Sequence, residues 1–138
     1  MQQTDSAEVP EVDVALYLIG EFCPEEVGAA FGVVPNVAVA KGSQRRRKST
    51  GEVIGIYSDS TWGFSSAQVV MSNEIDEHVT WLIGTGAAAK GLINESIHAF
   101  IEVRMQCNTS CVLPESLLEF AGKLSAEIGI VARASNAA

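Results

Sequence analysis

The sequence predicts an α+β fold, a two-layer sandwich in which about three helices pack on one face of a mostly antiparallel sheet of roughly four or five strands. Strand-like and helix-like patterns alternate along the 138 residues. One segment has a clear two-residue period, and others combine helix start signals with an apolar stripe. The length fits one core, so we expect a single domain at residues 12–134 between flexible tails at residues 1–11 and 135–138.

A strand and a short helix are predicted at the start of this domain. Residues 12–19 form a compact apolar run rich in Val, Leu and Ile, as in a central strand. Pro24 suits the first turn of a helix, two glutamates follow it, and Gly32 provides a natural end. Alternating Val and Ala at residues 37–40 then indicate a short edge strand.

Residues 53–70 are predicted to form a strand or a hairpin. Apolar and aromatic side chains dominate the segment, and a polar turn interrupts it at residues 58–60. Trp62 and Phe64 lie two residues apart, so both should point to the same face of a strand.

A helix is expected next, with Asn73 as its cap and apolar residues at helical spacing behind it. Glycine weakens a helix by about 1 kcal/mol relative to alanine. We therefore expect a break near Gly84 and a continuation through residues 87–93.

The last third of the chain contains the clearest strand, because apolar and polar residues alternate at residues 97–105. Pro114 is expected to open the final helix and Gly129 to end it. Residues 130–134 are predicted to form a last short strand.

The charge is distributed unevenly. The net charge is −8, yet five of the nine Lys and Arg residues lie between positions 41 and 48, namely Lys41, Arg45, Arg46, Arg47 and Lys48. Without this basic run the chain keeps four basic and seventeen acidic residues, a net charge of −13. Such a body repels nucleic acid and anionic membranes at long range, so nucleic acid is not an expected partner.

The basic run has three interpretations. Glycine and hydroxyl residues around it predict an exposed loop, which could be simply solvated, could dock on an acidic protein surface, or could contact phosphate. Arginine binds carboxylates in a bidentate manner, which favours docking on protein. The candidate residues for a partner or an anion are the five cations and Trp62, an aromatic residue on the strand expected after the loop.

Other patterns are weak. The glycine-rich residues 84–91 lack the spacing of a phosphate-binding loop and predict a helix break or a packing site. Cys107 and Cys111, with Cys23 and two histidines, do not form a specific zinc pattern. No catalytic triad emerges, and His78 shares an apolar helical face as a packing histidine would. We therefore assign no catalytic residue, metal or cofactor.

The compartment predicted from the sequence is the cytoplasm. The cysteine count is odd, and the first residues lack the basic start and apolar core of a signal peptide. The longest apolar run is too short to span a bilayer. Free thiols in a reducing compartment, and no membrane partner, are expected.

Six stretches, taken in order, carry a family resemblance: V-D-V-A-L-Y-L-I-G-E-F-C-P-E-E-V-G-A-A-F-G, K-G-S-Q-R-R-R, S-T-W-G-F-S-S, E-I-D-E-H-V-T-W-L-I, I-H-A-F-I-E-V-R and L-P-E-S-L-L-E-F-A-G-K-L-S-A-E-I-G. Over residues 12–134 the chain resembles the bacterial family called domain of unknown function 4279. The resemblance implies a compact α+β domain in bacteria and no established activity.

Two functional hypotheses follow. The first is a non-catalytic domain that binds another protein, in an immunity-type or regulatory role, because the chain is small, acidic and without recognisable catalytic groups. Its partner would be an acidic protein or a second copy of the chain. The alternative is a small-molecule-binding or enzymatic domain that uses a cleft between the sheet and the helices.

Overall fold

The computed structural model describes residues 11–106 and 112–133, and the predicted tails and the segment from Cys107 to Cys111 lie almost entirely outside this part of the chain. The strands are β1 (Val12–Gly20), β2 (Val37–Val39), β3 (Gln44–Arg46), β4 (Val53–Ile56), β5 (Ser60–Ser65), β6 (Ile97–Gln106) and β7 (Glu127–Arg133). The helices are α2 (Pro24–Phe31), α3 (Ile75–Thr85) and α4 (Glu115–Leu124), with short 3₁₀ segments η1 (Ser66–Gln68) and η2 (Gly86–Gly91).

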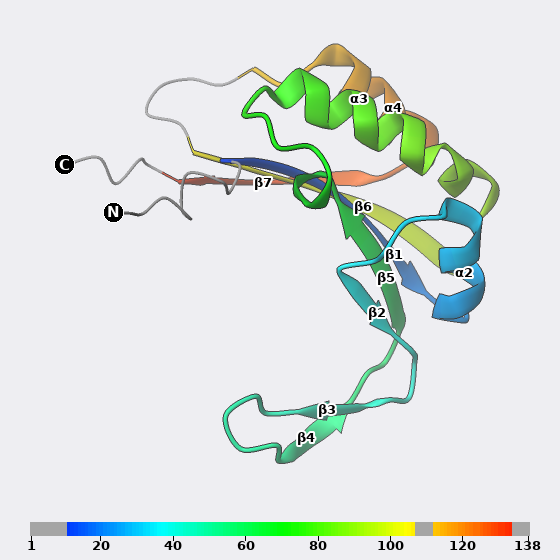
Figure 1. Cartoon of the computed structure of the whole chain (residues 1–138). Coiled ribbons are helices and arrows are strands. Elements are labelled where there is room, and N and C mark those ends of the chain that lie inside the picture. The colour runs from blue at the N-terminus through cyan, green and yellow to red at the C-terminus, as the bar shows by residue number, and fades with distance from the viewer. Residues whose placement is uncertain (1–10, 107–111, 134–138) are drawn as a thin grey trace, which may run out of the picture.

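The main sheet has the strand order β2-β5-β1-β6-β7, and β3 and β4 form a separate two-stranded sheet. Within the main sheet β1 pairs antiparallel with both β5 and β6, and β5 pairs antiparallel with β2. Only β6 and β7 run parallel, which requires a crossover connection, and α4 provides it. The helices lie together on one side of the sheet (Figure 1). The predicted α+β fold is confirmed.

The core lies between this sheet and its helices. In β1 and β6, every second residue points to the helices and is buried: Val12, Val14, Leu16, Leu18, Ile97, Ala99, Ile101, Val103 and Met105. Trp62 and Phe64 of β5 enter the same layer, as their spacing predicts, and the Trp62 ring stacks on Phe31 of α2 at 4.8 Å between ring centroids. The space between sheet and helices is therefore filled with apolar side chains.

Two aromatic rings lie flat on the opposite face of the sheet. A side chain at Gly63 would put its Cβ 2.2 Å from the Tyr17 ring, and one at Gly129 would lie 2.7 Å from the Phe100 ring. Because both glycines lack a Cβ, each ring can cover the neighbouring strand. No helix of the described residues covers this face (Figure 1).

Two predicted helix boundaries are wrong, whereas the predicted break near Gly84 is confirmed to within one residue. Asn73 does not cap α3, because its Oδ1 accepts the Glu11 N–H at 2.8 Å and the helix begins two residues later. At its other end α3 stops at Thr85, one residue after Gly84, and the chain continues as η2 from Gly86 to Gly91. Finally, α4 ends at Leu124, where Ser125 adopts a left-handed φ of 52°, so Gly129 lies inside β7 instead of ending the helix.

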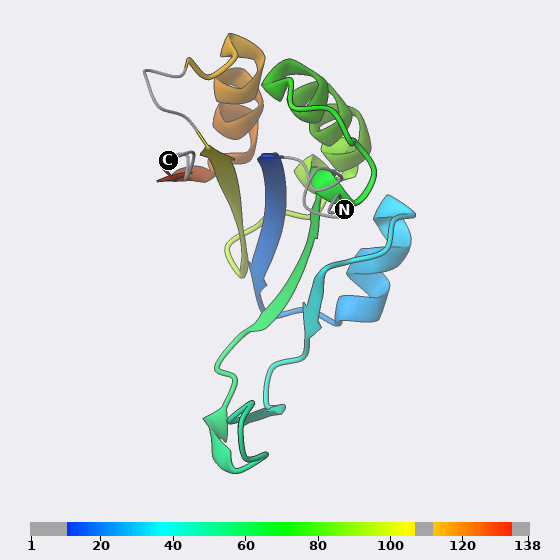
Figure 2. The same ribbon diagram turned by 60° about the vertical axis from the view of Figure 1, so that its left-hand side comes forward.

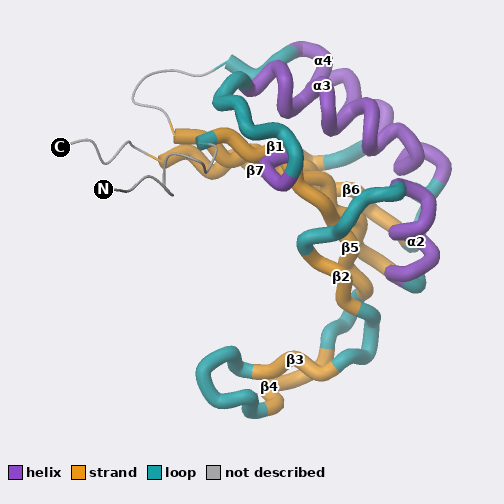
Figure 3. Tube along the Cα trace, in the orientation of Figure 1, coloured by secondary structure: helices purple, strands orange, loops and turns teal. Residues whose placement is uncertain are grey.

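The basic run is exposed as predicted, but it is not simply a loop. Three of its residues form β3, which pairs with β4, and β5 returns to the main sheet after a short turn. Residues 53–70 therefore do not form one hairpin, because β4 and β5 belong to different sheets. The tube view shows this two-stranded ribbon set apart from the other strands (Figure 3). We call residues 42–57 the arm.

None of the described helices combines the length and the apolar character needed to cross a membrane.

Candidate functional site

The arm is the most exposed part of the described chain. It leaves the end of β2, projects away from the helices and the sheet, and returns at the start of β5 (Figure 2). Every arm residue is exposed except Gly55 and Tyr57, which are half-buried. Its side chains are therefore available to a partner and add little to the core.

Backbone hydrogen bonds give the arm a defined shape. At its base the Gly42 N–H donates to the Tyr57 carbonyl and the Tyr57 N–H to the Ser43 carbonyl, both at 2.9 Å. At its tip the Gly51 N–H donates to the Arg47 carbonyl at 2.7 Å, with Gly51 at a φ of 76°, in the left-handed region that favours glycine. The ribbon is thus preorganised, which lowers the entropy lost when it binds.

A second set of contacts fixes Lys41, which we call the root of the arm, to the body, by which we mean the described residues outside the arm. The buried Ser60 hydroxyl accepts the Lys41 N–H at 2.9 Å and donates to the Phe22 carbonyl at 2.7 Å. The Lys41 ammonium also lies 2.6 Å from a Glu21 carboxylate oxygen. This ion pair lowers the pKa of Glu21 and raises the pKa of Lys41, so both groups stay charged over a wide pH range. Lys41 therefore belongs to the root and not to the free surface of the arm.

The other four predicted cations lie on the arm itself. The Arg45 guanidinium lies 5.7 Å from the centre of the Tyr57 ring. Arg46 donates to Gln44 Oε1 at 2.6 Å and to the Gly51 carbonyl at 2.9 Å, and Arg47 lies 3.5 Å from the Glu52 carboxylate. For Lys48 no ion pair forms with any described residue. These exposed contacts hold the cations in place while leaving donors free.

Trp62 does not lie beside the cations. It is 2% exposed, because its side chain points from β5 into the helix layer, where Phe31 stacks on it. A partner at the surface cannot reach this ring. The aromatic residue next to a guanidinium is instead Tyr57, which follows β4.

The arm also carries aliphatic side chains that the sequence interpretation did not identify as part of a site. Val53, Ile54 and Ile56 of β4 are 45%, 47% and 65% exposed. Their apolar pattern is typical of a core strand, and only the pairing of β4 with β3 shows that they face water. Cations and aliphatic residues therefore occupy the same small ribbon.

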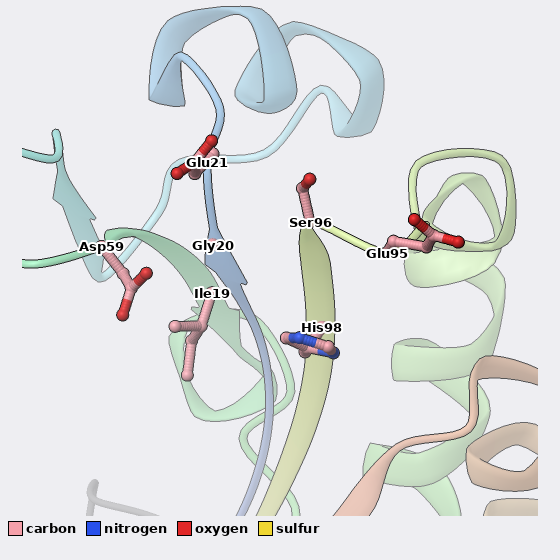
Figure 4. Close-up of a pocket in the computed structure, with 7 residues that line it drawn as sticks. All are labelled: Ile19, Gly20, Glu21, Asp59, Glu95, Ser96 and His98. Atoms are coloured by element: carbon pink, nitrogen blue, oxygen red, sulfur yellow. The ribbon is translucent and has the colours of Figure 1, made fainter.

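A pocket of about 310 Å³ opens near the root of the arm, between the ends of β1, β5 and β6. It is lined by Ile19, Gly20, Glu21, Asp59, Glu95, Ser96 and His98 (Figure 4). The Glu95 side chain points away from the other two carboxylates, and Glu21 is paired with Lys41. Among the described residues, no hydrogen bond connects His98 to a carboxylate, so the pocket lacks a paired acid and base.

His78 and Ser66 form a buried polar cluster with Asp13. Both are 0% exposed. His78 Nε2 lies 2.6 Å from the Ser72 carbonyl, which can only accept, so this nitrogen carries the proton and Nδ1 accepts the Ser66 hydroxyl at 2.5 Å. Ser66 Oγ also accepts the Val14 N–H at 2.9 Å, and Asp13 contacts Ser66 instead of the imidazole.

The cluster therefore joins β1, η1 and α3 and is not a hydrolytic triad. In a triad the carboxylate orients the histidine, and the serine is open to substrate. Here the Asp13 carboxylate contacts the serine and not the histidine, and the Ser66 hydroxyl is buried. The prediction of a packing histidine at position 78 is confirmed, with complete burial.

The remaining weak patterns have structural explanations or lie outside the described residues. Gly86 packs against Leu16, Phe120 and Phe64, where a Cβ would lie within 3.5 Å of each side chain. Cys23 is an exposed free thiol that donates to Glu25 at 2.9 Å, a bond that lowers the pKa of Glu25. Within residues 11–106 and 112–133, no three His, Cys, Asp or Glu side chains gather as metal ligands would.

Comparison with known proteins gives one match. A family model described as Domain of unknown function (DUF4279) matches residues 10–134, a range that contains the arm and every described helix and strand. No curated protein and no solved structure matches the chain. The chain therefore belongs to the family described as Domain of unknown function (DUF4279), as its ordered motifs indicated.

Proposed function

We propose that this protein is a non-catalytic binding module that docks the arm on an acidic surface of a protein partner, in a regulatory or immunity-type role. The observation that carries the proposal is the arm itself, a preorganised ribbon that presents Val53, Ile54 and Ile56 together with exposed guanidinium groups. The small size and the acidic body fit a module of this kind.

The composition of the arm suits a protein surface. Exposed aliphatic side chains gain no free energy from burial until a partner covers them, and exposed apolar patches mark interaction sites. Guanidinium groups around such a patch select carboxylates, which they bind through paired hydrogen bonds. A partner with an apolar centre and an acidic rim fits both features.

The charge of the rest of the molecule argues for protein over nucleic acid. The residues outside the arm carry a net charge of −11, beside a ribbon of net charge +3, so a long polyphosphate that extends past the arm would meet repulsion from the body. A compact acidic protein patch can avoid that repulsion. Non-specific salt-dependent binding to nucleic acid is not expected.

The alternative function, which uses a cleft between the sheet and the helices, has less support. Apolar side chains fill that space. The buried His78 is committed to two hydrogen bonds, and the pocket next to His98 lacks a paired acid and base. A reducing compartment such as the cytoplasm is part of the proposal, since Cys23 is a free and exposed thiol.

The test is photo-crosslinking of the full chain in its native host. A benzophenone amino acid replaces Ile54 on the arm in one strain and Leu118 on α4 in a matched control, because the two side chains are 47% and 52% exposed. We expect a covalent adduct with a polypeptide from position 54 and none from position 118. Mass spectrometry identifies the polypeptide.

Two results would contradict the proposal. One is an absence of polypeptide adducts from position 54, and the other is an adduct that nuclease removes. Loss of the adduct when Arg45, Arg46 and Arg47 are changed to Ala would strengthen it, because these side chains are expected to supply the contacts with carboxylates.

A further inference from the structure

A second exposed apolar surface surrounds Trp81 of α3. Two adjoining depressions of about 440 and 470 Å³ share the Trp81 ring. Their other lining residues are Gly32, Val33, Val34, Gln68 and Val69 on one side and Val70, Asp76, Glu77 and Thr80 on the other. We call this surface the Trp81 groove. It combines apolar walls with two carboxylates of the first turn of α3.

The groove is complementary to the arm in chemistry. Val34 and Val69 are 76% and 59% exposed beside the ring, so they gain from contact with the aliphatic side chains of an arm. Asp76 and Glu77 at the rim suit the cations of the arm, and the Trp81 face suits a guanidinium group. An acidic and apolar surface of the kind proposed as the partner is thus present on the protein itself.

The groove and the arm of one copy lie at opposite ends of the β2–β5 pair. The arm follows β2 and precedes β5, whereas Val34 precedes β2 and Val69 follows β5. The arm also projects away from the helix layer that contains Trp81 (Figures 1 and 2). A copy therefore cannot place its arm in its own groove, and the contact has to be made between two copies.

The position of β2 makes a symmetric arrangement available. It is an edge strand of the main sheet, and a free edge is a surface where another copy can approach. If two copies meet side by side at β2 around a two-fold axis, their strands run in opposite directions. The end of β2 from which one arm leaves then lies beside the start of β2 in the other copy, where the Trp81 groove of that copy is found. The strands of the arm have three and four residues, so the paired part of the ribbon extends about 13 Å, enough to cross between neighbouring sheet edges.

We propose that a second copy of this chain is a partner of the arm, and that in a two-fold dimer each arm occupies the Trp81 groove of the other copy. This inference rests on the proposed function and names its partner. The two-fold axis repeats every contact, so each arm and groove pair needs to supply only half of the roughly 1,600 Å² of a standard interface.

The test uses charge reversal at exposed positions of the purified full-length chain. An arm variant carries Arg47→Glu and Lys48→Glu, and a groove variant carries Asp76→Lys and Thr80→Lys. A control variant carries Glu115→Lys and Glu119→Lys, which are exposed on α4 and one turn apart as in the groove variant. Circular dichroism checks the fold, and sedimentation equilibrium measures the mass against the 14.6 kDa of one chain.

We expect the wild type and the control variant to form dimers and each of the other two variants to dimerise at least about ten-fold more weakly, because like charges then face each other. Mixing the arm variant with the groove variant should restore the dimer, since each negative arm meets a positive groove and each positive arm a negative one. A merely unfolded variant would not be rescued by mixing.

A monomeric wild type over the whole concentration range, or a groove variant that dimerises like the control, would overturn the inference. The proposed function would survive either result if position 54 still crosslinks to a different polypeptide. The proposed function and the dimer inference would both be contradicted if position 54 gave no polypeptide adduct.

Discussion

Strands β4 and β5 are three residues apart in the chain and have opposite environments. All of β5 except the half-buried Thr61 is buried, and its aromatic side chains pack against α2 and α3. In β4 every residue except the half-buried Gly55 is exposed, although the other three residues are Val or Ile. The body therefore uses its apolar residues to fill a core, and the arm presents them to water.

Because of this difference, substitutions in the body and in the arm should have different effects. Substitutions in the body should change the free energy of unfolding, because close-packed side chains have no room to adjust. Substitutions in the arm should leave that free energy almost unchanged and alter partner binding. Pairs of similar substitutions, one in the body and one in the arm, test this distinction. Equal effects on the free energy of unfolding in the two regions would show that it is false.

The largest expected effect is at Trp62. Trp62→Ala removes a buried ring that stacks on Phe31 and should lower the free energy of unfolding by about 3–5 kcal/mol. Tyr57→Ala removes a half-buried arm ring next to Arg45 and should cost less than about 1 kcal/mol. Urea unfolding followed by circular dichroism measures both. Equal losses for the two rings would show that the arm is part of the core.

The next effect compares the two histidines. His78→Ala leaves the buried Ser66 hydroxyl and Ser72 carbonyl without this partner, which should cost about 1–3 kcal/mol for the unsatisfied groups. His98→Ala changes an exposed side chain and should remain within about 0.5 kcal/mol of the wild type. If His98→Ala were the more damaging substitution, His78 would not have the structural role described above.

Removing the arm charges should have little effect on stability. Arg45, Arg46 and Arg47 changed together to Ala should alter the free energy of unfolding by about 1 kcal/mol or less, since exposed ion pairs contribute little. The same variant should lose the adduct from position 54. A large drop in thermal stability would mean that these side chains hold the fold together.

The smallest effect is expected at the root of the arm. Because the ion pair lowers the pKa of Glu21, its contribution is present above the ordinary carboxyl pKa and is lost as the pH falls through the folded value. Because it raises the pKa of Lys41, the contribution is also present below the ordinary lysine pKa and is lost as the pH rises through the folded value. The pair therefore holds the root between these limits.

Nuclear magnetic resonance can follow this contact. On acidification the amide resonance of Lys41 should shift in the wild type, and in the Glu21→Gln variant the shift should be absent or much smaller. An identical titration in the two proteins would assign the effect to another carboxyl group.

Most helices and strands were predictable because their signals are local. Alternation in β6, the apolar run of β1 and Pro24 in α2 each act within a few residues. The wrong boundaries had non-local or unusual causes. Asn73 binds Glu11 across 62 positions, and Ser125 ends α4 in a conformation that non-glycine residues rarely adopt.

The candidate site was predictable only in part. The cluster of cations indicated the position of the arm, because the charge of a residue is known from the sequence without its tertiary contacts. The burial of Trp62 and the exposure of Ile56 depend on which strand pairs with which. An apolar strand has the same pattern whether it lies in a sheet or in a projecting ribbon. The groove around Trp81 brings residues 32–34 together with residues 68–70 and 76–81, so no local pattern indicates it.

The most direct test of the separation between arm and body is hydrogen exchange of the full chain, free and bound to the polypeptide captured at position 54. In the free protein the amides of β3 and β4 should exchange through local opening, well before those of β1 and β6. Binding should slow exchange in β3 and β4 and leave the amides of β1 and β6 unchanged. Arm amides as protected as those of β1 in the free protein, or unchanged on binding, would contradict it.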